Sequence, residues 1–496
     1  MLLAKKIDSK SFIPKRLTQS LCASAATLIL LVGGTSSPTV RAEIRLPDLG
    51  DGSSSRISPQ REKILGQAWL RAFRAQVRTS SDPLMYEYIE QLLQDLAPYS
   101  QLRDYNLDLV IIPSPTINAF AVPGGVVGVN TGLFLYAGTE NQMASVLTHE
   151  LAHLSQRHFA RSLEQQANST IPTMAGLLAS LILAAATGST DAGLAALSAT
   201  QAAALDSQLR FSRQNEQEAD RLGFQTMIAS GRNPEAGAEM FERMLRELRY
   251  TSRPPEFLLT HPVTESRVAD ARNRAQKFEP KQYEVNQRFY LMQARARLIH
   301  SENPNVAAKI FRHELDGETA SMDASRYGLG LALTDAGQFD EAAEQLRYLI
   351  EKDPNEVAYI TALAKLESKQ GNAEQAITRL YDALQSRPQS HPLNVALSEV
   401  LMDAGRYSQA ELILTNHSER RPKDDYVWYL LAEVRGLAGN ILGLHEARAE
   451  YFILNGIYDK ARIQLNNALK IADSDYKKAL LEQRLEDVDR LANEKI

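Results

Sequence analysis

Cysteine is almost absent from this chain, since Cys22 is the only one among 496 residues. A single thiol cannot form an internal disulfide, so disulfide staples are excluded, and so is a zinc site built from cysteines. Cys22 also lies in an N-terminal segment that we expect to be removed, which would leave the mature chain without a thiol. Such a chain suits an oxidising compartment, where stray disulfides are a hazard.

Long apolar runs are also scarce, and the first of them belongs to an expected signal peptide. Basic residues within positions 5–16 precede a short apolar run at 21–32, and Val40-Arg41-Ala42 then offers small residues for cleavage. The run is too short to span a bilayer comfortably, which disfavours an uncleaved anchor. We therefore expect residues 1–42 to be a signal peptide that is cleaved after Ala42.

Basic residues are outnumbered once this segment is set aside. The whole chain has a formal charge of −5, but residues 1–42 hold six Lys and Arg against Asp8 alone, which leaves −10 on the remainder. An acidic mature chain argues against nucleic acid or anionic lipid as the main partner, although local patches could bind either.

Charged residues are absent from a second stretch, between Gln165 and Thr190, and residues 171–187 within it are strongly apolar. A membrane span is one interpretation, but Pro172, Gly176 and the modest apolar length favour a buried or surface-lying hairpin. We expect a lid near an active site, because this segment interrupts the helices that carry the motifs described below.

The chain is longer than a single compact domain usually is, and its composition predicts three parts after the signal peptide. Residues 43–60 are rich in Gly, Pro and Ser, as in an extended linker. Residues 61–282 combine helical patterns, the first from about 62 to 96, with expected strands at 107–112 and 126–129. Residues 283–496 consist of one helical pattern after another. The expected fold is mainly α, with a small sheet in the first domain and an α-solenoid in the second.

Four residue types recur in phase through the C-terminal part, with a period of 34 residues. Each unit is expected to be two helices, in which Gly permits the tight turn, Ala permits close packing and Pro ends the second helix. The in-phase positions are Gly337, Gly371, Gly405 and Gly439; Ala342, Ala376 and Ala410; Leu346, Leu380 and Leu414; and Pro354, Pro388 and Pro422. The pattern resembles tetratricopeptide repeats and predicts a solenoid that recruits partners.

The two ends of this repeat array depart from the regular pattern. Asn303 and Ala308 fit the same register one unit upstream, more weakly. Gly456 and Ala461 fall half a period out of step, so we expect the helix near 442–454 to serve two units.

A HELAH motif carries the first sign of chemistry. Thr139 and Gln142 match a capping box that opens a helix, and His149 and His153 lie four residues apart on one face of it. Both imidazoles could therefore reach one metal ion, and Glu150 is placed to move a proton between water and a leaving amine. Flanking leucines predict that this helix is buried, where His and Glu need a partner that a metal supplies.

The third ligand distinguishes the classes of zinc peptidase. A metzincin would continue the motif with Gly and His at the places where this chain has Gln156 and Phe159, so that class is excluded. His158 lies about half a turn from the ligand face and is expected to be structural or solvent-facing. A gluzincin instead takes Glu from a second helix, for which residues 215–220 (NEQEAD) provide candidates.

NAFAVPGG (118–125), HELAH and NEQEAD in that order resemble the peptidase family that includes HtpX and the CAAX prenyl proteases. The resemblance implies a gluzincin-type zinc metalloendopeptidase with one Zn²⁺ per chain, in which Glu216 completes the ligand set. It also implies that Asp220 holds a ligating His by hydrogen bond. Glu218 is the rival ligand, but it points to another face and is expected at the surface. His261-Pro262 with Arg267 is similar to a downstream element of that family.

His261 has two possible functional roles and one structural role. It could donate a hydrogen bond to a developing oxyanion, or it could occupy a fourth zinc position and hold the enzyme off. The structural alternative is a His that caps a helix beside a Pro turn.

A strand expected within residues 118–130 could bind an extended peptide at its edge, or could simply be a sheet edge packed on the catalytic helix.

The exported peptidase with repeats resembles periplasmic members of the family that act in outer-membrane β-barrel assembly. The implied partners are the β-barrel assembly machinery and the lipopolysaccharide-transport barrel, and the implied substrates are misfolded outer-membrane proteins. The competing hypothesis is a non-catalytic chaperone or scaffold, which the presence of Glu150 disfavours because a structural metal site does not need that residue.

Overall fold

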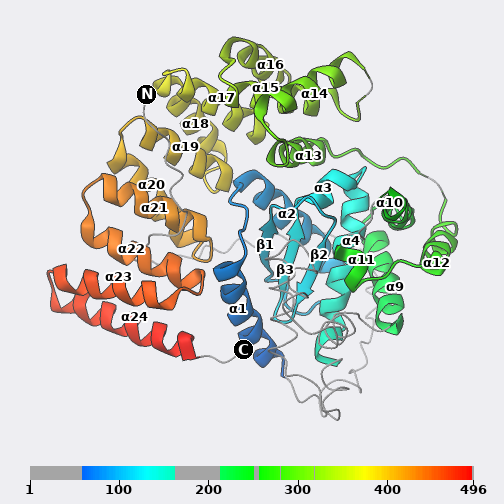
Figure 1. Ribbon diagram of the computed structural model, residues 1–496, viewed down its shortest axis with the longest axis horizontal. Coiled ribbons are helices and arrows are strands. Elements are labelled where there is room, and N and C mark those ends of the chain that lie inside the picture. The colour runs from blue at the N-terminus through cyan, green and yellow to red at the C-terminus, as the bar shows by residue number, and fades with distance from the viewer. Residues whose placement is uncertain (1–57, 162–212, 251–255, 280, 318, 494–496) are drawn as a thin grey trace, which may run out of the picture.

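The computed structural model describes residues 58–161, 213–250, 256–279, 281–317 and 319–493 (Figure 1). The expected signal peptide and the apolar segment 171–187 lie outside these residues. The domain boundaries placed after residues 42, 60 and 282 stay predictions.

Two helices stand where a single helical region was expected between residues 62 and 96. They are α1 (Pro59–Gln76) and α2 (Pro83–Leu96). Pro83 has no backbone N–H and favours an extended residue before it, so the helix pattern breaks there. Asp82 is extended and its carboxylate accepts the N–H groups of Leu84 and Met85, which starts α2.

A three-stranded sheet lies beside these helices. Its strands β1 (Asp108–Ile112), β2 (Ala119–Val122) and β3 (Val126–Asn130) are arranged in the order β1-β3-β2. Strand β3 pairs in parallel with β1 and antiparallel with β2, which leaves β2 at an edge. Every residue of β1 and β3 is buried, so both faces of the sheet are covered. The two strands expected from the sequence are confirmed to within one residue at each end.

The motif-bearing helix α4 (Glu140–Ser155) packs against β2. It follows the short helix α3 (Gly132–Tyr136) and begins as predicted, because the Thr139 hydroxyl accepts the N–H of Gln142 at 3.3 Å. Helix α9 (Arg213–Ala229) lies along α4, and Gly223 lets the two backbones approach closely. A Cβ at Gly223 would lie 3.1 Å from the backbone N of His149. Helices α10 (Ala236–Tyr250), α11 (Glu256–Thr260) and α12 (Glu265–Ala275) complete this part.

The rest of the described chain is a solenoid of antiparallel helices. Their bounds are α13 (Gln287–Ile299), α14 (Pro304–Asp316), α15 (Met322–Asp335), α16 (Phe339–Lys352), α17 (Val357–Lys369), α18 (Ala373–Ser386), α19 (His391–Asp403), α20 (Tyr407–Arg420), α21 (Asp425–Leu437), α22 (Ile441–Leu454), α23 (Tyr458–Ile471) and α24 (Asp475–Asn493). In Figure 1 these helices form an arc along two sides of residues 58–279.

The in-phase residues of the repeats have the roles that the sequence predicts. The four glycines have φ between 73° and 84°, and a Cβ would meet nothing within 4 Å, so backbone conformation rather than space requires glycine there. The in-phase alanines and leucines are fully buried. Helix α22 packs on both α21 and α23.

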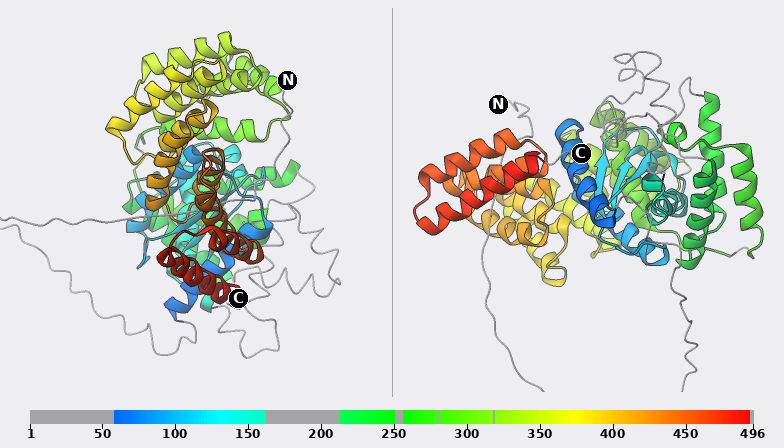
Figure 2. Two further views of the ribbon diagram at one scale, coloured as in Figure 1. Left: turned by 90° about the vertical axis from the view of Figure 1, so that its left-hand side faces the viewer. Right: turned by 90° about the horizontal axis from the view of Figure 1, so that it is seen from below.

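Polar contacts join the solenoid to the first part of the chain. Arg421 forms an ion pair with Glu90 of α2, and Lys423 forms one with Asp108 at the start of β1. The last helices of the solenoid (orange to red) and helices α9–α12 (green) lie on opposite sides of the sheet (Figure 2). Within the described residues, no helix combines the length and the apolar character needed to cross a membrane.

Candidate metal centre

Helix α4 carries the three residues of the HELAH motif into the protein interior. His149, Glu150 and His153 are all at most 4% exposed. The Nε2 atoms of the two histidines lie 3.0 Å apart, as expected for imidazoles one turn apart on the same helix face. The flanking Leu147 and Leu151 are fully buried, which explains why this part of the helix is inside.

Glu216 reaches the two histidines from the first turn of α9. Its side chain is buried, with Oε1 lying 3.4 Å from Nε2 of His153 and Oε2 lying 3.5 Å from Nε2 of His149. The close packing of α9 on α4 therefore brings together residues that are more than sixty positions apart in the sequence.

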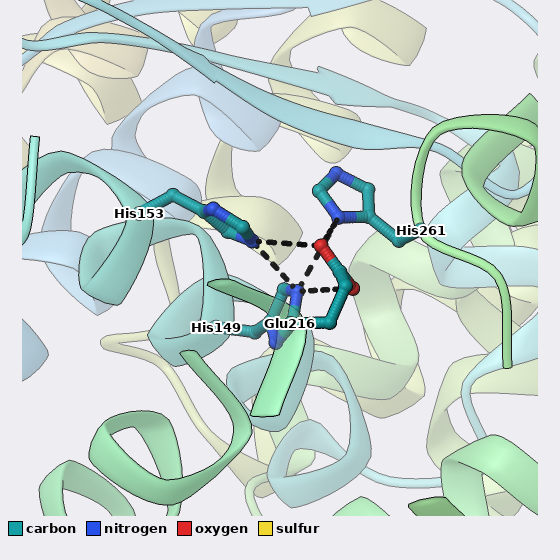
Figure 3. A group of neighbouring side chains, drawn as sticks. All are labelled: His149, His153, Glu216 and His261. Atoms are coloured by element: carbon teal, nitrogen blue, oxygen red, sulfur yellow. Dashed lines mark hydrogen bonds and ion pairs between the residues drawn. The ribbon is translucent and has the colours of Figure 1, made fainter. Parts of the chain in front are cut away.

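His261 adds a third imidazole directly after α11. Its Nδ1 atom lies 2.9 Å from Oε1 of Glu216 and 3.4 Å from Nε2 of His149. The ring stacks on Phe257 with centroids 4.8 Å apart, and its backbone N–H donates to the carbonyl of Phe257. Four residues thus point at one place (Figure 3), each with a ligand atom within 4.8 Å of the other three.

Asp220 and Arg267 support this group from behind. Oδ1 of Asp220 lies 3.1 Å from Nδ1 of His149, on the side of the ring opposite the cluster. Arg267 donates to both carboxylate oxygens of Asp220 at 2.7 Å, and its Nη1 lies 2.9 Å from Oε2 of Glu216. It also donates to the carbonyl of Pro262, which ties the segment after His261 to α9. The reach of Arg267 to Glu216 was not apparent from the sequence.

The structure excludes the solvent-facing alternative for His158, whereas Glu218 lies outside the four-residue group, as expected. His158 is fully buried, with Nδ1 lying 2.9 Å from Nδ1 of His153. The half-turn estimate fails because α4 ends at Ser155 and Arg157 leaves the helical conformation with φ 51°. Glu218 is only partly exposed, and Oε2 of its carboxylate lies 3.1 Å from Nε2 of His158.

Glu150 lies beside the cluster. Its carboxylate accepts the backbone N–H of Ala121 in β2, and Oε1 lies 3.6 Å from Nε2 of His261. Oε1 has no hydrogen-bond partner among the described residues. Burial raises the pKa of this carboxyl above its usual value, more than the neighbouring histidines lower it. A buried carboxyl beside the cluster, with one oxygen that has no partner among the described residues, is suited to exchanging a proton with a water molecule.

Burial and hydrogen bonding act in opposite directions on the other members of the cluster. Burial alone would lower the pKa of His149, but hydrogen bonds to Asp220 and Glu216 outweigh it and raise this pKa to about 10. Burial lowers the pKa of His153 well below its usual range. The pKa of Glu216 is well below normal, because His261 and the other histidines outweigh its burial.

The donor set fits a zinc ion. Imidazole nitrogens and a carboxylate oxygen are ligands that zinc takes in proteins. The buried charge of Glu216 and the free oxygen of Glu150 also fit a site built around a cation and water. His149, His153, Glu216 and His261 are the residues that could hold it.

Comparisons with known proteins agree with this geometry. Residues 83–275 match peptidase family M48, and residues 368–434 match a tetratricopeptide repeat. The chain is 35% identical over 447 residues to the β-barrel assembly-enhancing protease of Escherichia coli K12, which covers 89% of this chain and 91% of that protein. It is 34% identical over 452 residues to a protein described as a putative β-barrel assembly-enhancing protease of Vibrio cholerae, covering 91% and 92%. The mitochondrial metalloendopeptidase OMA1 of Schizosaccharomyces pombe is 31% identical over 182 residues, 36% of this chain and 50% of that protein.

Proposed function

This chain belongs to the β-barrel assembly-enhancing proteases, metalloproteases with a peptidase domain of family M48, and we propose that zinc is its metal. His149, His153 and Glu216 would be the three protein ligands of a catalytic site, which needs one further position for water or substrate. Their convergence on one buried place is the observation that supports this proposal most directly.

His261 would occupy the fourth position when no substrate is present. The contacts of its Nδ1 atom with Glu216 and His149 support this role over that of an oxyanion donor, because the ring faces the ligand atoms themselves. A site closed by four protein ligands leaves no room for a water molecule. Movement of the segment that carries His261 would then be required before the enzyme acts.

A bound zinc ion would polarise the scissile carbonyl and make a nearby water more acidic. Glu150 would accept a proton from that water and donate it to the leaving amine. Its burial beside the cluster supports this assignment. Asp220 would hold His149 through Nδ1, so that Nε2 keeps its lone pair for the metal, and Arg267 would hold Asp220 in place.

Strand β2 would bind the substrate as an added strand. Asn130 donates to the carbonyl of Asn118, and this register turns the backbone groups of Ala119 and Ala121 away from β3. The N–H of Ala121 is taken by Glu150 and Ala119 is fully buried, which leaves the carbonyl of Ala121 for a peptide. Main-chain pairing of this kind ignores side chains and suits a protease for proteins with unpaired strands.

The wider role that we propose is quality control of outer-membrane proteins in the periplasm. The name of the relatives, the expected signal peptide and the absence of thiols after residue 42 support this location and role. The repeats would recruit the β-barrel assembly machinery and the lipopolysaccharide-transport barrel, while the peptidase domain would degrade misassembled barrel proteins. Antiparallel helix pairs of this type form extended binding surfaces for other proteins.

Replacing Glu150 tests the catalytic part of the proposal. Glu150→Gln in the full mature chain should lower degradation of casein and of a misfolded β-barrel protein by about 10²- to 10⁴-fold, because a general base is lost. Zinc content, measured by elemental analysis, should stay near one ion per chain. Glu279→Gln, at an exposed position, is the matched control and should keep wild-type activity. Full proteolysis by Glu150→Gln would refute this mechanism.

A further inference from the structure

The turn after α4 contains the only non-glycine residue with positive φ among the described residues, Arg157 at 51°. Helix α4 ends there with the N–H of Gln156 bonded to the carbonyl of Ala152 and the N–H of Arg157 bonded to the carbonyl of Leu154. A left-handed residue at a helix end is usually glycine, so an arginine with this conformation marks a position where the surrounding structure imposes it.

The side chain of Arg157 forms an ion pair that a glycine at this position could not form. Its Nε and Nη2 atoms lie 3.1 Å from Oε1 of Glu62 on α1, and both side chains are largely buried. The ion pair ties the turn to α1. The next residue, His158, begins a new helical turn, and its side chain contacts His153 of α4.

His158 connects a ligand of the candidate zinc site to a carboxylate. The Nε2 atom of His153 faces the cluster, so Nδ1 is the outer nitrogen of this ring, and it lies 2.9 Å from Nδ1 of His158. The other nitrogen of His158 lies 3.1 Å from Oε2 of Glu218. Three side chains from α4, the following turn and α9 thus form one path that ends at an anion.

Glu218, the last residue of this path, determines which nitrogen of each imidazole carries the proton. An ionised carboxylate only accepts hydrogen bonds, so Glu218 requires the proton of neutral His158 to be on Nε2. Nδ1 of His158 must then accept, which requires His153 to donate from its own Nδ1. A neutral His153 protonated there has its lone pair on Nε2, the atom that faces the other ligand atoms.

We propose that His158 is a positioning residue that, together with Glu218, fixes the tautomer and the ring orientation of the zinc ligand His153. His149 receives the same support directly from Asp220. His153 lies too far along the helix to share that carboxylate, and His158 spans the distance to the next one. Hydrogen-bond partners of this kind raise the basicity of a ligand and hold its ring toward the metal.

The proposal rests on the zinc centre proposed above, and the test separates the two. Zinc affinity of the full mature chain is measured by competition with a chromophoric chelator, and the geometry of the site is followed by the absorption bands of bound Co²⁺. His158→Phe, which keeps a ring but removes both nitrogens, should weaken zinc binding by about 10- to 100-fold. Glu218→Gln should weaken zinc binding by about tenfold. An amide can both donate and accept a hydrogen bond, so it does not fix which nitrogen of His158 carries the proton. Both variants should shift the Co²⁺ bands.

Two further variants are the references. Arg161→Gln removes the other partner of Glu218 without touching His158, and zinc affinity should change by less than about twofold. His153→Ala should lose zinc binding. Wild-type zinc affinity and Co²⁺ bands in both His158→Phe and Glu218→Gln, with binding lost in His153→Ala, would overturn the positioning role alone. Wild-type affinity in His153→Ala would overturn the zinc centre as well.

The metal-free proteins complete the experiment, because a buried His can also serve packing. Thermal unfolding in the presence of a chelator should be alike for wild type and Glu218→Gln. A lower unfolding temperature of both metal-free variants, with unchanged Co²⁺ bands, would show a purely structural role and would overturn the proposal.

Discussion

The Nδ1 atom of His149 lies 3.1 Å from Oδ1 of Asp220, on the side of the imidazole away from the candidate metal position. Asp220 stands one helical turn after Glu216 on α9, so a single helix supplies both a candidate ligand and the support of another. Arg267 contacts both of these carboxylates and neutralises part of their charge. An Asp four residues after the Glu in the second motif is therefore placed to contact His149.

Asp220→Asn tests the support of His149. We expect zinc to bind about 10- to 100-fold more weakly, because the amide no longer selects the tautomer with Nε2 free. Chelator competition measures the change. Asp270→Asn on α12, which removes an exposed ion pair with Arg274, is the control and should leave the affinity unchanged. Equal affinities in wild type and Asp220→Asn would contradict the assigned role.

His261→Ala tests whether His261 closes the site. We expect casein degradation and self-cleavage to rise several-fold, by about one order of magnitude at most, because a closed site opens to water and substrate. Product formation on gels measures both, at equal zinc content. A fall in activity instead would support the role of oxyanion donor, for which the loss would be about 10²- to 10³-fold.

Acid should destabilise the solenoid through two buried histidines. Nδ1 of His391 lies 2.9 Å from Nε2 of His417, and Arg421 stands nearby. Burial lowers both pKa values from 6.5 to about 3, so the unfolded chain binds more protons between these values. Stability is therefore fully present above about pH 6.5 and falls toward pH 3, by about 1.4 kcal/mol per pH unit for each histidine.

His417→Phe keeps a ring against His391 and removes one of these titrations. Urea unfolding at pH 7.5 and at pH 5.0, followed by tryptophan fluorescence, gives the loss of stability on acidification. The loss should be smaller in the variant by about 2 kcal/mol, since one proton uptake is absent over about 1.5 pH units below 6.5. An identical acid loss in both proteins would show that this pair does not cause it.

Two glycines of the solenoid should respond to alanine in opposite ways. Gly405 has φ 73°, so Gly405→Ala should lower the free energy of unfolding by about 1–2 kcal/mol. Gly436 lies in the last turn of α21, where a Cβ would make an ordinary contact at 3.6 Å with Leu444. Gly436→Ala should raise the free energy of unfolding by about 0.5–1 kcal/mol, because alanine is the better helix former. Urea unfolding of the two variants measures both changes. A change of the same sign in both variants would contradict this prediction.

Much of the fold could be predicted because it depends on local patterns. The turns at the in-phase glycines need positive φ, which glycine adopts freely, and the capping pair of Thr139 and Gln142 acts within one helical turn. The split between α1 and α2 was missed, although Asp82 before Pro83 is a local signal that could have located it.

The surroundings of the site were less predictable, because they depend on where the chain goes after a helix ends. His158 was placed by extending the helix beyond Ser155, but the left-handed Arg157 changes the direction of the chain. No periodicity signals that conformation in an arginine. The buried position of Arg267 between two carboxylates likewise depends on how α12 packs, which the spacing of the motifs does not encode.

By itself the sequence determined the residue types that could bind a metal, the spacing that puts His149 and His153 on one face, and the repeats that form the solenoid. These follow from helix geometry and from side-chain chemistry, which act over a few residues. The resemblance already favoured Glu216 over Glu218, but only the tertiary structure decided that His261 joins the two histidines and Glu216, and that His158 contacts His153. The physical reason is that α4, α9 and the turn after α11 are brought together by packing, and packing fixes which side chains face the same buried place.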